Sequence, residues 1–208
     1  MKTGMRTGIR RVAGLLTTCG ICLLLLAAAL ALREGWAAAE SAKQLENTAL
    51  ALQALMPERY SAEVTAGLPA LPVLQCPDGD YAGLIAFAGC LTEQESGGEL
   101  PLKAATEAGH RVPVILREEA ETGLLAVCMD EIPLCMGQLL QMDEGEAITL
   151  SSLTGAGYRY EIRRRTACAD PQALLAGWTE AGPALLVFLR GSRDRDFTVY
   201  ICTLGETR

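Results

Sequence analysis

One long apolar segment near the N-terminus constrains the fold of this chain more than any other feature. Residues 12–32, VAGLLTTCGICLLLLAAALAL, contain no charged residue and no proline. As a helix rising about 1.5 Å per residue, the segment would be about 30 Å long, which is enough to cross a bilayer. We therefore predict a transmembrane anchor over residues 12–32, separate from any globular domain that follows it.

Basic residues on one side of this segment predict its orientation. Arg10 and Arg11 precede it directly, and positive charges flank the cytoplasmic end of membrane helices. Residues 1–11 are expected to form a cytoplasmic basic tail, which places the C-terminal domain outside the cell membrane. The alternative is a cleaved signal peptide with Trp36-Ala-Ala-Ala as the cleavage site, although the apolar run is longer than most signal-peptide cores.

Charge is distributed unevenly along the chain. Residues 1–33 hold five of the 18 basic residues and none of the acidic ones, which leaves 13 basic and 25 acidic residues, a net charge of −12. An acidic domain argues against nucleic acid as a partner, because phosphate binding needs a basic surface. It also argues against docking on an anionic membrane surface. The simplest interpretation is that the negative charge keeps the domain soluble.

The cysteines do not form a metal-binding pattern. Two of the eight lie in the apolar segment, and the chain has a single histidine. Zinc sites of the usual kind need a fuller ligand set, so we expect no metal and no cofactor. The six outer cysteines either form disulfides or are small buried apolar residues; they are Cys76, Cys90, Cys128, Cys135, Cys168 and Cys202.

Residues 33–79 are predicted to form a helix and a linker, the helix being either a stalk or a helix that lies on the domain. Residues 37–56 have a partial apolar stripe at helical spacing, and Pro57 ends the predicted helix. Residues 57–80 contain four prolines, which is typical of a linker. We therefore expect the globular domain to begin near Asp80 and to occupy residues 80–208.

Short apolar runs separated by glycine-containing turns follow Asp80. We predict strands over residues 81–88, 99–102, 112–116, 123–129, 145–151, 158–167, 184–189 and 196–204. One or two helical turns are expected at residues 134–142. A second short helix starts at Asp170-Pro171, an N-cap acid followed by proline. This pattern predicts a mostly β fold, a small barrel or sandwich, and not a parallel α/β sheet.

The order of these parts resembles the sortases, the membrane-anchored cysteine transpeptidases of Gram-positive cell surfaces. Tyr81-Ala-Gly-Leu-Ile with Glu99-Leu-Pro-Leu is similar to the opening pattern of the family. The segment from Gly137 to Ile148 is similar to the one that follows the catalytic histidine. Tyr158-Arg-Tyr-Glu-Ile, followed by Asp170-Pro171, is similar to the next conserved run. The resemblance covers residues 80–204, is nearest to small clostridial-type, class B-like sortases, and implies a sortase-like β-barrel.

The same resemblance implies a catalytic triad. A cysteine attacks a sorting signal, a histidine acts as acid and base, and an arginine stabilises the developing negative charge. Aligned on the central helix and the strand after it, the histidine position falls on Met129 or Asp130. Aligned on the last hairpin, the cysteine position falls on Leu189 and the arginine position on or beside Asp196. Since Met cannot shuttle a proton and Leu cannot be a nucleophile, this register predicts a degenerate catalytic site.

A second register would restore the triad. Ala108-Gly-His110 is similar to the histidine motif, and the run from Cys202 to Arg208 is similar to the cysteine-to-arginine segment. However, Arg208 is the last residue given, so no following strand would orient it. His110 also lies well before the strand and helix that should follow it. Chance similarity is the alternative explanation for both motifs.

The run Arg163-Arg164-Arg165 is the remaining charged motif of interest. At the end of a strand in an acidic domain, it predicts a solvated or ion-paired edge that prevents strand addition. A carboxylate-binding role is the alternative.

Three functions follow from these residues. The first is a membrane-anchored extracytoplasmic protein, sortase-like but catalytically inactive, that binds a sorting-signal peptide, a pilin or a true sortase. The second is an active sortase that uses His110, Cys202 and Arg208 to attach surface proteins to the cell wall or to pilins. The third is a structural or envelope protein whose barrel is only superficially sortase-like.

Overall fold

The computed structural model describes residues 4–58, 60–61, 71–77, 79–87, 99–104, 112–132, 134–179, 182–191 and 194–205. Within these ranges, the side chains of residues 4–20, 60–61, 131, 134–136 and several positions between 31 and 42 lie outside the description. The chain divides into two compact units, Met1–Ala42 and Lys43–Arg208. Each unit is considered by itself.

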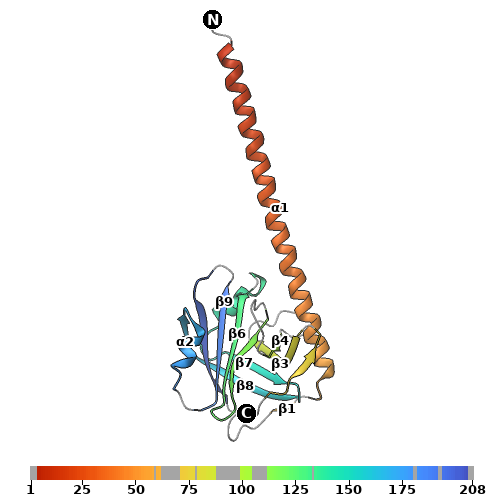
Figure 1. Ribbon diagram of the computed structural model, residues 1–208, viewed down its shortest axis with the longest axis vertical. Helices are drawn as coiled ribbons and strands as arrows, with labels where there is room; N and C mark the ends of the chain where they lie inside the picture. Colours follow the sequence, from red (N-terminus) through yellow and green to blue (C-terminus); the bar gives the residue numbers. More distant parts are fainter. Residues whose placement is uncertain are drawn as a thin grey trace. The chain divides into compact units, whose positions relative to one another are not determined.

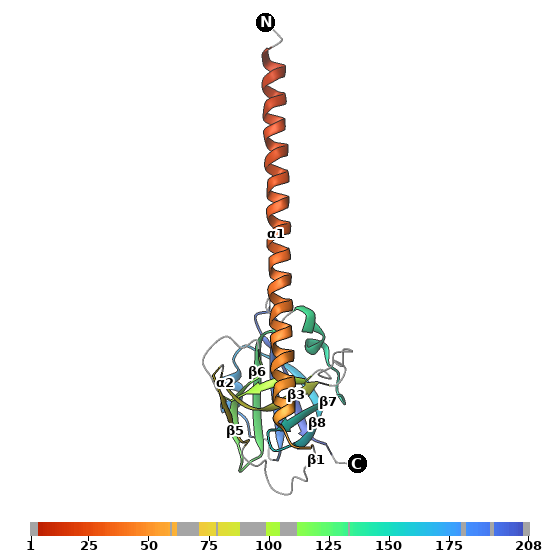
Figure 2. The same ribbon diagram turned by 90° about the vertical axis from the view of Figure 1, so that its right-hand side faces the viewer.

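Eight strands in the described part of the second unit close into a β-barrel (Figures 1 and 2). Around the barrel they run β8, β10, β9, β6, β5, β4, β3 and β7, and β7 pairs with β8 to close the ring. The closed ring confirms the predicted mostly β class and favours the barrel over the sandwich. The bounds are β3 Gly79–Phe87, β4 Glu99–Lys103, β5 Val114–Glu119, β6 Leu124–Ile132, β7 Ala147–Ser152, β8 Ala156–Cys168, β9 Ala184–Gly191 and β10 Phe197–Leu204.

The barrel contains both parallel and antiparallel neighbours. Strands β6 and β9 run parallel, as do β4 and β5, whereas the other neighbours in the ring are antiparallel. Two short strands, β1 Tyr60–Ser61 and β2 Leu74–Cys76, pair with β8 and β3. The parallel β6–β9 pair matters most for function, because it sets side by side two segments that are far apart in sequence.

Side chains alternate between the inside and the outside of the barrel. In β8, Tyr158, Tyr160 and Ile162 are buried in the interior cluster. Arg159 and Arg163 are exposed on the opposite face, as the sequence pattern predicted.

Strand β9 is buried on both of its faces. Leu185, Val187 and Leu189 belong to the interior cluster. Leu186 and Phe188 belong to a second cluster on the outside of the barrel. A strand buried on both faces requires a continuous apolar run, which explains the sequence ALLVFL.

Helix α2, Pro171–Ala176, covers part of the outer cluster (Figure 1). The Asp170 carboxylate accepts a hydrogen bond from the Gln172 amide at 2.9 Å, so the predicted N-cap is confirmed. Leu175 is buried in the outer cluster. The Arg117 guanidinium donates to the Leu175 carbonyl at 2.9 Å and so fixes the C-terminal turn of the helix.

The 3₁₀ helix η1, Leu134–Gln141, follows β6 and packs against the end of β9. The Tyr200 hydroxyl donates to the Leu139 carbonyl at 3.0 Å and accepts from the Met142 amide at 3.1 Å. The side chains of Leu139 and Met142 join the interior cluster. The predicted helical turns at residues 134–142 therefore hold the segment between β6 and β7 against the barrel.

Helix α1, Gly4–Leu55, runs without interruption through both segments for which the sequence predicted separate helices. Among the described residues, no helix combines the length and the hydropathy of a membrane span. Much of the predicted anchor falls outside the described side chains, namely residues 12–20 and 31–32.

The last turns of α1 belong to the barrel unit. Ala49 and Leu52 are buried against Tyr81 and Leu84 of β3. These contacts agree with the alternative in which this helix lies on the domain, and the compact unit begins at Lys43. A helix spacing of three residues puts both apolar side chains on one face, and the barrel covers that face.

Candidate functional site

The two positions that the resemblance assigns to histidine and cysteine lie side by side. Met129 of β6 and Leu189 of β9 are direct partners in the parallel pair. Both side chains point into the barrel and are 0% and 1% exposed. The tertiary structure therefore brings these two positions together, and fills both with apolar side chains that do not reach solvent.

The next residue on each strand faces the outside of the barrel. The Arg190 guanidinium donates two hydrogen bonds to the Asp130 carboxylate, at 2.7 and 2.5 Å. The guanidinium carbon of Arg190 also lies 4.4 Å from the ring centroid of Phe197. The side chains of Asp130 and Arg190 are 24% and 31% exposed, so this charge pair is partly shielded from water.

Asp196, at the predicted arginine position, is exposed immediately before β10. Its neighbour Phe197 pairs with Cys168. The pKa of the Cys168 thiol is raised, mainly by burial and further by the charges of Asp170 and Asp196.

The alternative triad is only partly within the described residues. His110 and Arg208 lie outside them. Cys202 is fully buried in the interior cluster, where it pairs with Leu185 and Ile162. Burial raises the pKa of its thiol to about 12. Such a thiol is protonated at neutral pH, which is the opposite of what a nucleophilic cysteine requires.

Cys128 resembles Cys202 in its surroundings. It is 3% exposed in the outer cluster, and burial together with the nearby Asp130 charge raises the pKa of its thiol to about 12. Neither cysteine is in a disulfide. Within the described ranges, no group of His, Cys, Asp and Glu side chains is arranged to hold a metal ion.

A shift in strand register separates the three arginines of β8. The pairing of β8 with β10 skips one residue, because Cys202 pairs with Ile162 and Ile201 with Arg164. Arg163 is the extra residue; its guanidinium donates to the Thr203 hydroxyl at 2.9 Å. A bulge of this kind re-aims the side chains that follow it, so Arg164 faces outward with Ile201.

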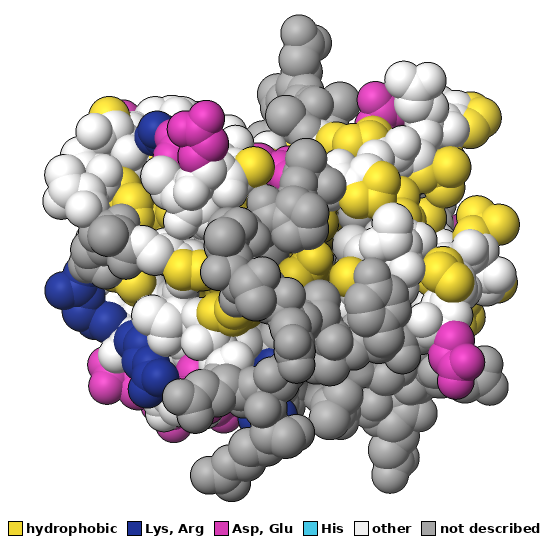
Figure 3. Space-filling view, turned by 90° about the horizontal axis from the view of Figure 1, so that it is seen from below, with side chains coloured by type: hydrophobic (Ala, Val, Ile, Leu, Met, Phe, Trp, Pro, Cys, Tyr) yellow, Lys and Arg dark blue, Asp and Glu magenta, His cyan; other side chains and the backbone are white. Residues whose placement is uncertain are grey.

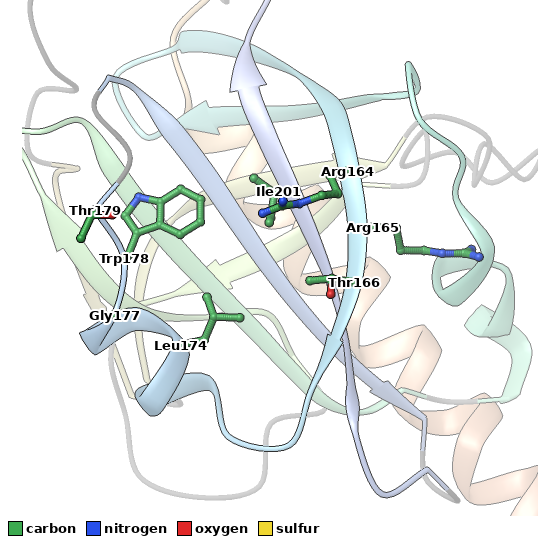
Figure 4. A pocket seen from close by; sticks show the side chains of 8 residues that line it. All are labelled: Arg164, Arg165, Thr166, Leu174, Gly177, Trp178, Thr179 and Ile201. Carbon is green, nitrogen blue, oxygen red and sulfur yellow. The ribbon is translucent and has the colours of Figure 1, made fainter.

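Arg164 lines an open pocket on the outside of the barrel. The pocket has a volume of about 430 Å³ and lies between β8, β10 and the end of α2. In Figure 4 the side chains of Arg164 and Trp178 point toward one another across Ile201, whereas Arg165 points away. We call it the Arg–Trp pocket; its lining residues are Arg164, Arg165, Thr166, Leu174, Gly177, Trp178, Thr179 and Ile201.

Sequence reasoning missed both Arg190 and Trp178 as members of a site. Alternation along β9 was the available signal for Arg190, since it shares the outer face with Leu186 and Phe188. No local signal marks Trp178, because its importance depends on the strand that faces it. The Arg run was expected as a solvated or ion-paired edge, and Arg163 does pair with Glu161 at 3.2 Å.

Charges of both signs are mixed on the face drawn in Figure 3. Lys and Arg side chains lie close to Asp and Glu side chains there. This mixture is typical of a solvated protein surface.

Comparisons with known proteins identify the fold. No known family model matches the sequence, and no curated protein matches it. The chain is similar to the Streptococcus agalactiae sortase C1 complex with MTSET, with 10% identity, 62% and 70% of the two chains covered, and a TM-score of 0.50. Other similar structures are Clostridium perfringens sortase C with the C-terminal cell wall sorting motif (9% identity, 62% and 72% covered, TM-score 0.49) and Listeria monocytogenes sortase A (12% identity, 61% and 88% covered, TM-score 0.47).

At these low sequence identities the similarity concerns the fold alone. The conclusion about the fold rests on the sortase C1 complex, which has a TM-score of 0.50. The barrel of this chain has a sortase-like fold. This result weighs against the third hypothesis, in which the barrel only superficially resembles a sortase.

Proposed function

We propose that this protein is a non-catalytic, sortase-like binding protein. It is anchored by residues 12–32 and displays its barrel outside the cell membrane, where it binds a sorting-signal-like peptide or a surface-protein partner such as a pilin or an active sortase. One observation carries the proposal: Met129 and Leu189, at the positions assigned to histidine and cysteine, are adjacent, apolar and buried.

The outward face of the same two strands supports this proposal. There the Arg190 guanidinium is paired with the Asp130 carboxylate through two charge-assisted hydrogen bonds. Neither side chain is a nucleophile for acyl transfer, which in sortase chemistry is a cysteine thiolate. These hydrogen bonds thus have a structural role at the outer end of the β6–β9 pair.

The state of Cys202 also supports the loss of catalysis. A thiol whose pKa burial raises to about 12 is almost entirely protonated at pH 7, and its position inside the barrel keeps substrate away. An active sortase built on Cys202 would require this residue to be exposed and its thiol pKa to be lowered.

A peptide transfer assay tests the proposal. The purified full-length chain is incubated with a fluorogenic sorting-signal peptide and an amine acceptor, beside an authentic sortase as positive control. We expect no turnover above buffer, and no change on Cys202→Ala. Turnover by the native chain that disappears in Cys202→Ala would overturn the proposal.

Thiol labelling provides an independent measurement. Cys202→Ala is expected to leave the number of thiols that react in the native protein unchanged, and to remove one thiol from the urea-unfolded protein. Cys76, which is half-buried, is the matched control. Cys76→Ala should also lower the number of thiols that react in the native protein.

Protease treatment of intact cells tests the proposed location, since an external barrel would be degraded.

A further inference from the structure

Helix α2 is attached to the outside of the barrel by a small contact area (Figure 1). Its six residues bury one side chain fully, that of Leu175, whereas Leu174 and the following Trp178 are half-buried. An isolated helix of this length is not stable in water, because its few backbone hydrogen bonds do not offset the cost of nucleation. The helix therefore depends on its contact with the outer cluster.

One side chain of the barrel holds the C-terminal end of this helix. Nη1 of Arg117, in β5, donates to the Leu175 carbonyl at 2.9 Å. The Trp178 amide donates to the same carbonyl at 3.3 Å. Carbonyls in the last turn of a helix need partners from outside the helix. Arg117 thus fixes the turn that carries Trp178.

Arg117 is itself held by the turn between β5 and β6. Its Nε donates to one oxygen of the Glu119 carboxylate at 2.7 Å, and its Nη2 forms an ion pair with the same oxygen. The Thr122 hydroxyl donates to the other oxygen at 3.0 Å. The pKa of the Glu119 carboxyl is lowered, first by the bond from Arg117 and next by that from Thr122. We call this connected set, Thr122, Glu119, Arg117 and the Leu175 carbonyl, the Arg117 strut.

The strands beneath α2 are held far more firmly. Strand β9 is hydrogen-bonded to β6 on one side and to β10 on the other, and its outer side chains Leu186 and Phe188 are 0% exposed. Opening these strands would break whole ladders of backbone hydrogen bonds. Opening α2 exposes one fully buried side chain and breaks the Arg117 strut. Elements with few buried contacts open at a lower free energy than the core does.

We propose that α2 is a latched flap, which opens from the barrel independently of the strands and is kept closed by the Arg117 strut. In the open state Trp178 leaves its place beside β8 and β10, so the Arg–Trp pocket loses one wall. Apolar side chains of the outer cluster, such as Phe188, become accessible at the same time. Glu119 acts through Arg117 and is a positioning residue. This inference goes beyond the proposed binding function and does not depend on it.

Hydrogen exchange of the full-length protein, followed by mass spectrometry, tests the flap. We expect residues 171–178 to exchange faster than β10 and with a weaker dependence on urea, because local opening exposes little surface. Arg117→Met should accelerate exchange in residues 171–178 about tenfold and leave β10 unchanged, since a charge-assisted hydrogen bond is lost from the closed flap alone. Glu119→Gln should have a smaller effect, because the guanidinium keeps its bond to the Leu175 carbonyl but is oriented less firmly.

Matched variants separate the strut from a general effect of charge. Glu121→Gln removes an exposed carboxylate of the same turn, and Arg159→Met removes an exposed guanidinium of β8. Neither should change exchange in residues 171–178. Arg117→Lys keeps the charge and should restore part of the protection. In the Arg117→Met background, Glu119→Gln should have no further effect, because the guanidinium through which it acts is gone.

Trp178 reports the same opening by fluorescence. The chain has two tryptophans, so Trp36→Phe in the full-length protein leaves Trp178 as the single indole. Quenching of its fluorescence by acrylamide should increase with Arg117→Met and stay unchanged with Arg159→Met, since the indole leaves the outer cluster when the flap opens.

Several results would overturn the inference. Equal exchange in residues 171–178 and β10, with equal dependence on urea, would show that α2 opens only when the barrel unfolds. Equal acceleration of both segments by Arg117→Met would make the strut a general stabiliser of the barrel, and no acceleration would remove it as the latch. A further effect of Glu119→Gln in the Arg117→Met background would contradict the positioning role of Glu119.

Discussion

Two outer regions of the barrel each place an arginine near an aromatic ring, with opposite consequences. At the end of β6 and β9, Arg190 stacks on the buried Phe197 and is held by Asp130. Beneath the end of α2, Arg164 faces Trp178 across an open pocket. The first arrangement is a half-buried structural contact, whereas the second lines an open pocket.

The difference comes from what each arginine meets across the sheet. The parallel register of β6 and β9 brings a carboxylate within hydrogen-bonding distance of Arg190. Arg164 stands opposite Ile201 in the register of β8 and β10, and the Arg–Trp pocket lies between these strands and the end of α2. The same residue types therefore lie in a half-buried contact in one place and along an open pocket in the other.

The largest expected effect lies inside the barrel, beneath the Asp130–Arg190 pair. Leu189→Ala removes a side chain that is 1% exposed and should lower the free energy of unfolding by about 2–5 kcal/mol, because it leaves a cavity. Urea unfolding followed by Trp178 fluorescence in the Trp36→Phe background measures it. Leu55→Ala, at a side chain 70% exposed, is the control and should change stability by about 0.5 kcal/mol or less. A loss below about 1 kcal/mol for Leu189→Ala would place its side chain outside the packed interior.

A smaller effect is expected for the charged pair itself. Asp130→Asn keeps the shape of the side chain but removes the carboxylate that accepts these two hydrogen bonds from Arg190. Stability should fall by about 1–3 kcal/mol, since hydrogen bonds to a charged group are lost. The same urea measurement applies, with the exposed Asp143→Asn as control. No difference between the two variants would mean that the Asp130–Arg190 pair is not structural.

The smallest effect is expected at the pocket. Arg164→Gln changes an exposed side chain and should alter the free energy of unfolding by about 0.5 kcal/mol or less. Urea unfolding of this variant beside Asp130→Asn compares the two arginine sites directly. Equal destabilisation would contradict the distinction between them and assign Arg164 a structural role.

Local patterns were sufficient to predict much of the secondary structure. The alternation of Tyr158, Tyr160 and Ile162 predicted which face of β8 is buried, and Asp170 predicted the start of α2. These features depend on neighbouring residues and on backbone geometry. The end of α1 was left open between a stalk and a helix lying on the domain, since its own sequence does not say that Ala49 and Leu52 pack against β3.

The sequence by itself determined a mostly β domain and the apolar character of Met129 and Leu189, because side-chain chemistry and period-two alternation are local properties. Only the tertiary structure decided that these two positions are partners and that Asp130 meets Arg190. It also decided that a register shift turns Arg164 toward Trp178. Strand register and helix docking depend on contacts between residues far apart in the chain, and local patterns carry no record of those contacts.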